Sequence, residues 1–303
     1  MRARILRATP TVRPVALPLP VLALLALTAL LLVPEPGAPS TGQRQAAHPV
    51  TFYDARAFSL ALEETAGLPV VPMPGARAVV VPHHWLAGHL ILSSLRDLRA
   101  GGEYDRVILI GPDHVGAAGA GAATSDLPWE TPFGLLQPDQ ESVSRLAAAG
   151  AARVEPDTLS HEHSVAGIVP AIAYYLPDAQ IVPLALRGDL DIGQVRTLAQ
   201  MLVPLLNDHT IVVASVDFSH YLSAPEARTR DADTLAAMEA MDSQRILAFG
   251  NEHLDSPPAI ALLSEMMRLL QRGEFTLRGD TNSGELRGLF RPPVTSYVTG
   301  YYR

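Results

Sequence analysis

Four short runs of apolar and β-branched residues recur along the chain and predict buried strands. They are Ala78–Val81, Arg106–Ile110, Gln180–Leu186 and Thr210–Val216. Runs of this length without polar alternation are typical of strands that are covered on both faces. Two further strands, Phe275–Arg278 and Thr295–Tyr301, are expected near the end of the chain.

Segments with helical periodicity lie between these strands, and this alternation sets the fold class. The helical patterns cover Leu86–Arg99, Gln140–Ala149, Ser164–Tyr175, Ile192–Leu206, the stretch from Pro225 to Phe249, and Ala259–Gln271. Strands that alternate with helices indicate a mainly parallel or mixed central sheet with helices on both faces. We therefore predict one α/β domain over residues 48–303.

The N-terminal 33 residues predict a targeting segment rather than a part of this domain. Four arginines up to position 13 precede a run from Pro14 to Pro34 that holds no charged residue. About 20 apolar residues can span a bilayer, and arginines before the span favour a cytoplasmic N-terminus. We expect residues 1–33 to be a signal or a transmembrane anchor and residues 34–47 to be a linker. The protein is then membrane-anchored or secreted, on the extracytoplasmic side.

The charge of the remaining chain argues against nucleic acid as a partner. The protein has 23 basic and 31 acidic residues, of which the first 47 positions hold five and one, respectively. The rest carries 18 basic and 30 acidic residues, a net charge of −12, and repels a phosphate backbone. The sequence has no cysteine, which excludes thiolate metal ligands and a cysteine nucleophile.

Histidines and aspartates directly follow three of the predicted strands. Pro82-His83-His84 follows the first, Gly111-Pro-Asp-His114 the second, and Asp217-Phe-Ser-His220 the fourth. In open α/β sheets, ligands and catalytic groups gather outside the carboxyl ends of the strands. Imidazole with carboxylate suits Fe, Zn, Mn or Cu, and two histidines with one carboxylate is the non-haem Fe(II) pattern. We therefore expect a metal site at this edge.

Five motifs, taken in order, resemble the Memo family. They are Pro82-His83, Ile110-Gly-Pro-Asp-His114, Trp129-Glu-Thr-Pro-Phe-Gly134, His161-Glu-His-Ser164 and Val216-Asp-Phe-Ser-His220. His48–Tyr53 and Thr295–Gly300 resemble the opening segment and the closing strand of that family. Memo proteins are the B component of the AmmeMemoRadiSam system, and their fold is similar to that of class III extradiol dioxygenases of the LigB type. The resemblance implies a LigB/Memo-like domain.

The resemblance also implies a site. The family groups the histidine of its Pro-His motif, the first histidine after Gly-Pro-Ser and a later cysteine as metal ligands; these positions correspond to His83, His114 and Asp255. His220 is expected beside the site as a proton donor or acceptor, and His163 corresponds to another family histidine near the pocket. Asp217 is expected to orient His220 or a metal-bound histidine, or to be a ligand itself.

Three departures from the family pattern change these implications. Pro-His-Ala-Gly-Tyr reads Pro82-His-His-Trp-Leu86, and Gly-Pro-Ser-His-His reads Gly111-Pro-Asp-His-Val115. Asp255 in place of a cysteine shifts the preference from soft toward harder metals. Glu252 and His253 are alternatives to Asp255 as the third ligand.

These features lead to the hypothesis of a dioxygenase-like, metal-dependent oxidoreductase that acts on a small molecule. Fe(II) is the first expectation for its metal, with Cu or Zn as alternatives. A non-catalytic extracytoplasmic module that binds a metal or another protein is one alternative, and a zinc-dependent hydrolase is a second. Radical-SAM partners of the family are cytosolic, so the expected location would separate this protein from them.

The segment Trp129–Gly134 allows two interpretations. Trp129 and Phe133 offer apolar walls for the rim of a pocket. A packed loop of the Ω type explains the same residues equally well, because long ordered loops do both.

Overall fold

Four parallel strands form the centre of the sheet, and they correspond to the four apolar runs. The computed structural model describes residues 46–119, 121–289 and 293–303. The central strands lie in the order β1 (Ala78–Val81), β8 (Thr210–Ser215), β2 (Arg106–Pro112) and β7 (Gln180–Leu186). Each neighbouring pair is parallel. All residues of β1 and β8 are buried, as expected for strands covered on both faces.

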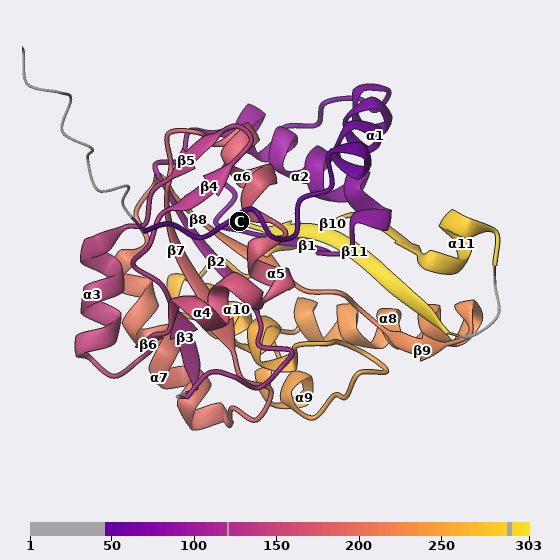
Figure 1. Cartoon of the computed structure of the whole chain (residues 1–303). Helices are drawn as coiled ribbons and strands as arrows, with labels where there is room; N and C mark the ends of the chain where they lie inside the picture. Colours follow the sequence, from indigo (N-terminus) through magenta and orange to yellow (C-terminus); the bar gives the residue numbers. More distant parts are fainter. Residues whose placement is uncertain (1–45, 120, 290–292) are drawn as a thin grey trace, which may run out of the picture. The chain divides into compact units, whose positions relative to one another are not determined.

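Mainly antiparallel pairs extend the sheet on both sides (Figure 1). β11 (Val294–Tyr302) pairs antiparallel with β1, with β10 (Phe275–Asn282) and with β9 (His220–Leu222). On the other side, β3 (Ala122–Thr124) is antiparallel to β7 and parallel to β6 (Arg153–Val154). This nine-stranded mixed sheet confirms the predicted fold class. The short strands β3, β6 and β9 escaped prediction because two or three residues show no periodicity.

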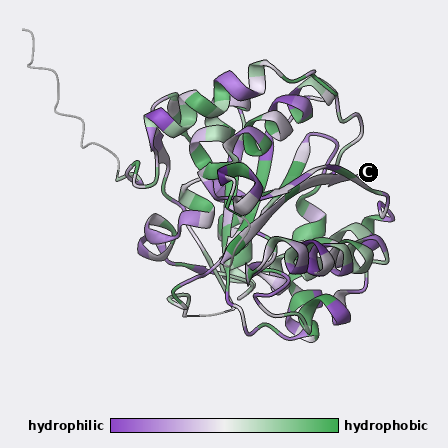
Figure 2. Ribbon diagram, turned by 90° about the vertical axis from the view of Figure 1, so that its right-hand side faces the viewer, coloured by the Kyte–Doolittle hydropathy of each residue, from purple (hydrophilic) through white to green (hydrophobic). Residues whose placement is uncertain are grey.

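Helices cover both faces, and alternate residues of each strand contribute to opposite cores. Ala78 and Val80 belong to the core that includes α7 (Ile192–Leu202) and α10 (Pro257–Leu270). Val79 and Val81 belong to the core that includes α2 (Gly88–Gly101) and α6 (Val169–Tyr175). The first core also includes residues of α3 (Gln140–Ala148), α8 (Ala224–Glu239) and α9 (Ser243–Leu247). The second core also includes residues of α1 (Ala55–Ala66), α4 (Pro156–His161) and α5 (His163–Ala166). Hydrophobic residues line the central strands and parts of these helices (Figure 2).

Three of the predicted helices are interrupted. The segment Ser164–Tyr175 is divided between α5 and α6, because Pro170 stands in the first turn of α6 and lacks the amide that a continuous helix needs. The helix α7 ends at Leu202, and a 3₁₀ turn at Val203–Leu205 follows. α8 and α9 are separated near Met241, whose φ is 49°. The helix α1, the 3₁₀ turn Trp85–Ala87 and α11 (Ser283–Arg287) were not predicted.

The segment Trp129–Gly134 forms a small hairpin. β4 (Trp129–Thr131) pairs antiparallel with β5 (Gly134–Leu136), and Trp129 is buried. Phe133 packs against Phe58 and Tyr174. The residues therefore pack against the second core, as the second interpretation expected, but the segment is a β-hairpin and not a loop of the Ω type.

His48 anchors the first described segment to this hairpin. Its ring stacks on Trp129 with centroids 3.9 Å apart. Its two ring nitrogens each lie 2.6 Å from a serine hydroxyl, Nδ1 from Ser160 and Nε2 from Ser125. Burial lowers the pKa of His48 to about 4, although Asp126 and Asp157 act against this shift. His48 is therefore neutral in the folded protein at neutral pH.

None of the helices in the described ranges is long and apolar enough to cross a bilayer. The predicted targeting segment at residues 1–33 and nearly all of the predicted linker at 34–47 lie outside those ranges.

The neutral state of His48 predicts a pH-dependent stability. In the unfolded chain its pKa is near 6.5, so the unfolded state binds the extra proton between pH 6.5 and about 4. The free energy of unfolding should fall as the pH drops through this window, by about 1.4 kcal/mol per pH unit from this residue. Urea unfolding at several pH values measures this dependence. The free energy of unfolding should change less steeply with pH in His48→Gln than in the wild type. Equal slopes for the two proteins would contradict the prediction.

Candidate metal centre

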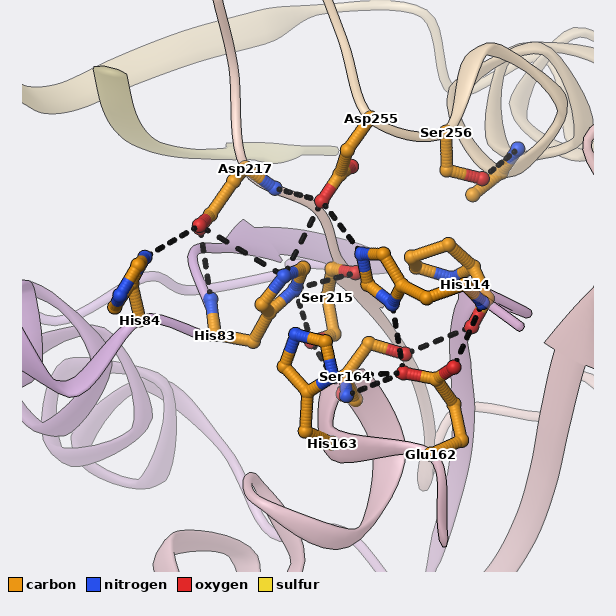
Figure 3. A network of polar contacts seen from close by, with 12 residues as sticks. His83, His84, His114, Glu162, His163, Ser164, Ser215, Asp217, Asp255 and Ser256 are labelled. Atoms are coloured by element: carbon orange, nitrogen blue, oxygen red, sulfur yellow. Dashed lines mark hydrogen bonds and ion pairs between the residues drawn. The ribbon is translucent and has the colours of Figure 1, made fainter. Parts of the chain in front are cut away.

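The carboxyl ends of three central strands bring the predicted residues together. His83 follows β1, His114 follows β2 and Asp217 follows β8, while Asp255 precedes α10. Parallel neighbours end at the same edge of a sheet, which explains why residues distant in sequence meet here. Figure 3 shows His83, His114 and His163 gathered between Asp255 on one side and Glu162 on the other.

Asp255 is the common partner of two of these histidines. Its Oδ2 lies 3.2 Å from Nε2 of His83 and 3.6 Å from Nε2 of His114. The same oxygen accepts a hydrogen bond from the backbone amide of Asp217 at 3.3 Å. The Asp255 side chain is 8% exposed, and its Oδ1 has no hydrogen-bond partner among the described residues. Oδ2 of Asp255 thus faces two imidazoles, while Oδ1 can still accept a hydrogen bond or bind a cation.

The second nitrogen of each imidazole has its own acceptor. Nδ1 of His114 donates to Oε1 of Glu162 at 2.8 Å, and Nδ1 of His83 lies 3.4 Å from the carbonyl oxygen of Ser215. An acceptor at Nδ1 keeps the proton on that nitrogen and leaves Nε2 as the metal-binding atom. This is the second-sphere arrangement that metal-ligating histidines usually have.

Glu162 is a central residue that the sequence did not reveal. Its carboxylate accepts from the backbone amides of His114 at 2.8 Å and Ser164 at 2.9 Å, besides the ring of His114. It also caps α5. The only signal was its place between two histidines in His161-Glu-His-Ser164, and such a local pattern does not show which strand the carboxylate will meet.

The absence of a side chain at Gly111 in β2 allows α5 to pack directly against this strand. A methyl group on Gly111 would lie 2.5 Å from Oγ of Ser164. That hydroxyl donates to the carbonyl of Pro112 at 2.9 Å, and Ser215 Oγ donates to the carbonyl of Ser164 at 2.6 Å. The segment that carries Glu162 is therefore bonded to both β2 and β8.

Asp217 contacts His83 and His84. Its Oδ1 accepts from the backbone amide of His83 at 3.0 Å, and its Oδ2 lies 3.7 Å from Nε2 of His83. Oδ2 is also 3.4 Å from Nδ1 of His84, a histidine to which the sequence gave no role. The hydrogen bond to the backbone amide of His83 fits the orienting role expected for Asp217. The approach of Oδ2 to Nε2 of His83 fits the other expected role, that of a ligand.

Charge balance at the site shifts several pKa values. Burial would lower the pKa of His83, but the carboxylates of Asp217 and Asp255 outweigh it and raise this pKa to about 9. Burial opposes the shift at His114 too, yet hydrogen bonds to Asp255 and Glu162 raise its pKa to about 10. Burial would raise the pKa of Asp255, whereas His83 and His114 hold it well below its usual range. Asp255 thus stays ionised and needs positive charge beside it, from imidazolium protons or from a cation.

His163 differs from its neighbours. Its ring stacks on His114 with centroids 4.3 Å apart and meets the ring of His83 edge-on at 5.0 Å. Burial and the two neighbouring histidines lower its pKa to about 4. His163 is therefore neutral, which is the form that binds metals.

Two sets of three side chains are close enough to hold one metal ion. His83, His114 and His163 form one set, and His83, Asp217 and Asp255 form the other, with the ligand atoms of each set within 4.8 Å of one another. The sequence-derived set of His83, His114 and Asp255 takes members from both. The two sets share His83, and the sequence-derived set is not itself one of them.

His220 lies at the edge of a small pocket beside this centre. The pocket, of about 200 Å³, is lined by His220 together with His114 and Asp255. Nδ1 of His220 is buried and has no hydrogen-bond partner among the described residues. Glu252 and His253, the alternatives for a third ligand, are engaged elsewhere: His253 lies 3.4 Å from Asp233 and 3.5 Å from Glu252.

An α/β sheet with a histidine and carboxylate cluster at the carboxyl ends of its strands defines a protein with a candidate metal-binding site. The family follows from comparison with known proteins. A family model for Memo-like proteins matches residues 44–300. The chain belongs to the Memo-like family, as its motifs predicted.

Known relatives agree with this assignment. A MEMO1 family protein of Methanopyrus kandleri is 28% identical over 242 residues, covering 76% of this chain and 81% of the relative. A MEMO1 family protein of Aeropyrum pernix is 29% identical over 280 residues, covering 85% and 97%. The crystal structure of the uncharacterized protein JW3007 from Escherichia coli K12 superimposes with a TM-score of 0.51 at 13% identity, over 74% of this chain and 99% of that one. That last likeness supports the fold.

The contacts of Glu162 predict that it is important for stability. Glu162→Ala should leave two backbone amides and the His114 ring without their acceptor, and should lower the free energy of unfolding by about 3 kcal/mol. Urea denaturation followed by circular dichroism measures this loss. Glu141→Ala is the matched control, because Glu141 is exposed and its one ion pair in the described part of the chain is with Arg145 one turn away. A loss no larger than that of the control would show that the buried hydrogen bonds are not needed.

Proposed function

We propose that the protein binds one metal ion through His83, His114 and Asp255, and that this ion supports oxidative chemistry on a small molecule. One observation carries the proposal. The Nε2 atoms of both histidines face the same carboxylate of Asp255, while both Nδ1 atoms have acceptors of their own. Removing two imidazole protons would give a cation two neutral nitrogen ligands and one oxygen ligand.

The donor set fits Fe(II) first and Cu or Zn next. Two imidazoles with one carboxylate match the non-haem iron pattern, and a thiolate, which would favour softer ions, is absent from the sequence. The unpartnered Oδ1 of Asp255 fits a carboxylate whose full capacity is used by a cation. A bound iron or copper ion would supply Lewis acidity and electron transfer for a substrate such as an enediol or aromatic diol.

The protein's own residues would orient the metal ligands and transfer protons. Asp217 orients His83 through its backbone amide, and Glu162 does the same for His114. His220 lines the pocket, where its imidazole can take a proton from a substrate hydroxyl or return one. His163, neutral and beside His114, could do the same from the other side.

The histidine set of His83, His114 and His163 favours a second candidate. Three imidazoles that leave one position for water form the ligand set of several zinc hydrolases, and here their ligand atoms lie within 4.8 Å of one another. In that case Asp255 would accept protons rather than bind the metal. The contribution of Asp255 to metal binding therefore separates the two candidates.

The location of the protein is a further part of the proposal. A run without charge from Pro14 to Pro34, preceded by arginines, supports export or anchoring of the domain on the extracytoplasmic side. Such a protein would work apart from cytosolic radical-SAM enzymes.

Metal content tests the proposed site. Residues 46–303 carrying the wild-type site should hold about one metal ion per chain by mass spectrometry after anaerobic reconstitution with Fe(II), Cu or Zn. The double variant His83→Ala/His114→Ala and the single variant Asp255→Ala should lose it, whereas His163→Ala should keep it. His161→Ala is the control, because His161 is exposed and, within the described ranges, bonds only to the carbonyl of Asp157. Metal retained in Asp255→Ala but lost in His163→Ala would replace the first candidate by the second.

The role of His220 predicts a loss of activity without a loss of metal. In His220→Gln, oxygen consumption with aromatic diols should fall by a factor of about 10²–10⁴, as for removal of a general acid or base. Metal content should stay at the wild-type level, because His220 makes no ligand contact. An oxygen electrode with metal analysis of the same samples measures both. Full activity in this variant would remove His220 from the mechanism.

A further inference from the structure

The loop that joins α1 to β1 is apolar and exposed (Figure 1). It reads Gly67-Leu-Pro-Val-Val-Pro-Met-Pro-Gly75 and has no polar side chain. All of its residues except Met73 are exposed, and Leu68, Val70 and Val71 keep 42%, 53% and 38% of their surface. Contiguous apolar surface of this kind marks a contact site for another molecule or for a membrane.

This apolar loop, residues 67–75, is fixed to the domain at its centre. Met73 is buried in the second core, and its amide donates to the carbonyl of Asp97 in α2 at 3.2 Å. A methyl group on Gly101, at the end of the same helix, would lie 2.5 Å from the carbonyl carbon of Met73. The loop therefore packs directly against α2, and its exposed side chains are a lasting feature of the surface.

Backbone carbonyls of the loop are bonded to arginines of the domain. Arg96 in α2 donates to three carbonyls at 2.7, 3.1 and 2.8 Å, namely those of Thr65, Leu68 and Pro69. Arg278 in β10 donates to the carbonyl of Val71 at 3.4 Å. The carboxylate of Asp97 accepts from both arginines, at 2.9 Å from Nε of Arg96 and 3.3 Å from Nη2 of Arg278. These carbonyls therefore have partners without water.

Three prolines reduce the number of backbone donors in the loop. Positions 69, 72 and 74 are proline and have no amide hydrogen. A segment that enters the apolar layer of a bilayer has to satisfy its backbone groups without water, and the loop does so for several of them. Protein interfaces, in contrast, need hydrogen bonds across them, and this loop offers few groups for such bonds. Its bonding therefore favours lipid over a partner protein.

The chain that precedes the domain limits its distance from a bilayer. The proposed anchor ends at residue 33, and residues 34–45 connect it to Ala46, the first residue of the described domain. A connection of this length spans at most about 43 Å, which is close to the diameter of a domain of this size. An anchored domain would thus stay beside the lipid surface.

We propose that the apolar loop inserts into the surface of the membrane that carries the protein and fixes the orientation of the domain on it. The inference rests on the location given in the proposed function. Burial of Leu68, Val70 and Val71 at the boundary between headgroups and acyl chains stabilises the contact. The domain is acidic, so attraction to anionic lipid does not contribute. The pocket beside the metal centre is lined by other residues, and the contact leaves it free.

A fluorescent label at position 70 tests this contact. The sequence has no cysteine, so Val70→Cys gives the full chain a single site for the label. In phosphatidylcholine vesicles whose acyl chains carry a nitroxide, a quencher that acts at close range, this label should be quenched. Val154→Cys is the matched control, because Val154 is 41% exposed and lies in β6, at the opposite end of the sheet from β10. A label at position 154 should keep its fluorescence.

The apolar side chains beside the label should determine the quenching. Leu68→Ser/Val71→Ser in the labelled protein should reduce the quenching at least about twofold, because two apolar side chains no longer enter the lipid. Leu269→Ser is the control, because Leu269 is 39% exposed and lies on α10, which packs on the opposite face of the sheet. High salt should leave the quenching unchanged, since the loop carries no charge.

Quenching at position 70 that is no stronger than at position 154 would refute the loop contact. A blue shift of the label without quenching would also refute it, because a second copy of the chain would then cover the loop. Extraction of the same vesicles with alkaline carbonate reports separately on the anchor. A chain that carbonate removes would disprove the proposed location, while quenching at position 70 in that chain would still support the loop contact. An anchored chain with an unquenched label would disprove only the contact.

Discussion

Buried negative charge at the carboxyl edge of the sheet is the constraint on which the site depends. The side chains of Asp217, Asp255 and Glu162 are almost fully buried. In the described part of the chain, their ion pairs are all with histidines. Taking an unpaired charge out of water costs several kcal/mol, so the burial of these carboxylates depends on the histidines beside them. A cluster arranged by charge compensation is also one that a cation can enter.

The three carboxylates come from different layers of the fold, and this gives the centre its rigidity. Asp217 follows a central strand, Asp255 precedes α10 on one face of the sheet, and Glu162 caps α5, which belongs to the core of the opposite face. Both hydrophobic cores therefore converge on one set of side chains. Placement by strands and packed helices keeps ligand atoms in position more firmly than placement by a mobile loop.

The sequence predicted the parts of this molecule that depend on local patterns. The strands β1 and β7 begin and end where their apolar runs do, since burial on both faces leaves a direct trace in composition. Strand ends predicted His83, His114 and Asp217 as neighbours, while Asp255 required the resemblance to a family because nothing local marks it. Glu162 and His84 were missed, since their roles arise from contacts between distant segments. The breaks in Ser164–Tyr175 and Pro225–Phe249 were missed because periodicity alone hides them.

The close approach at Gly111 has a consequence for how such proteins can change over time. Ser164 fills the space that any side chain at position 111 would occupy. Ser164 belongs to the short helix α5, which begins next to Glu162, the residue that accepts the hydrogen bond from the ring of His114. The two positions therefore constrain each other across more than fifty residues of sequence. A lineage that gains alanine at 111 is expected to shed the serine at 164 as well. Such paired replacement would mark the helix and the strand as one inherited unit.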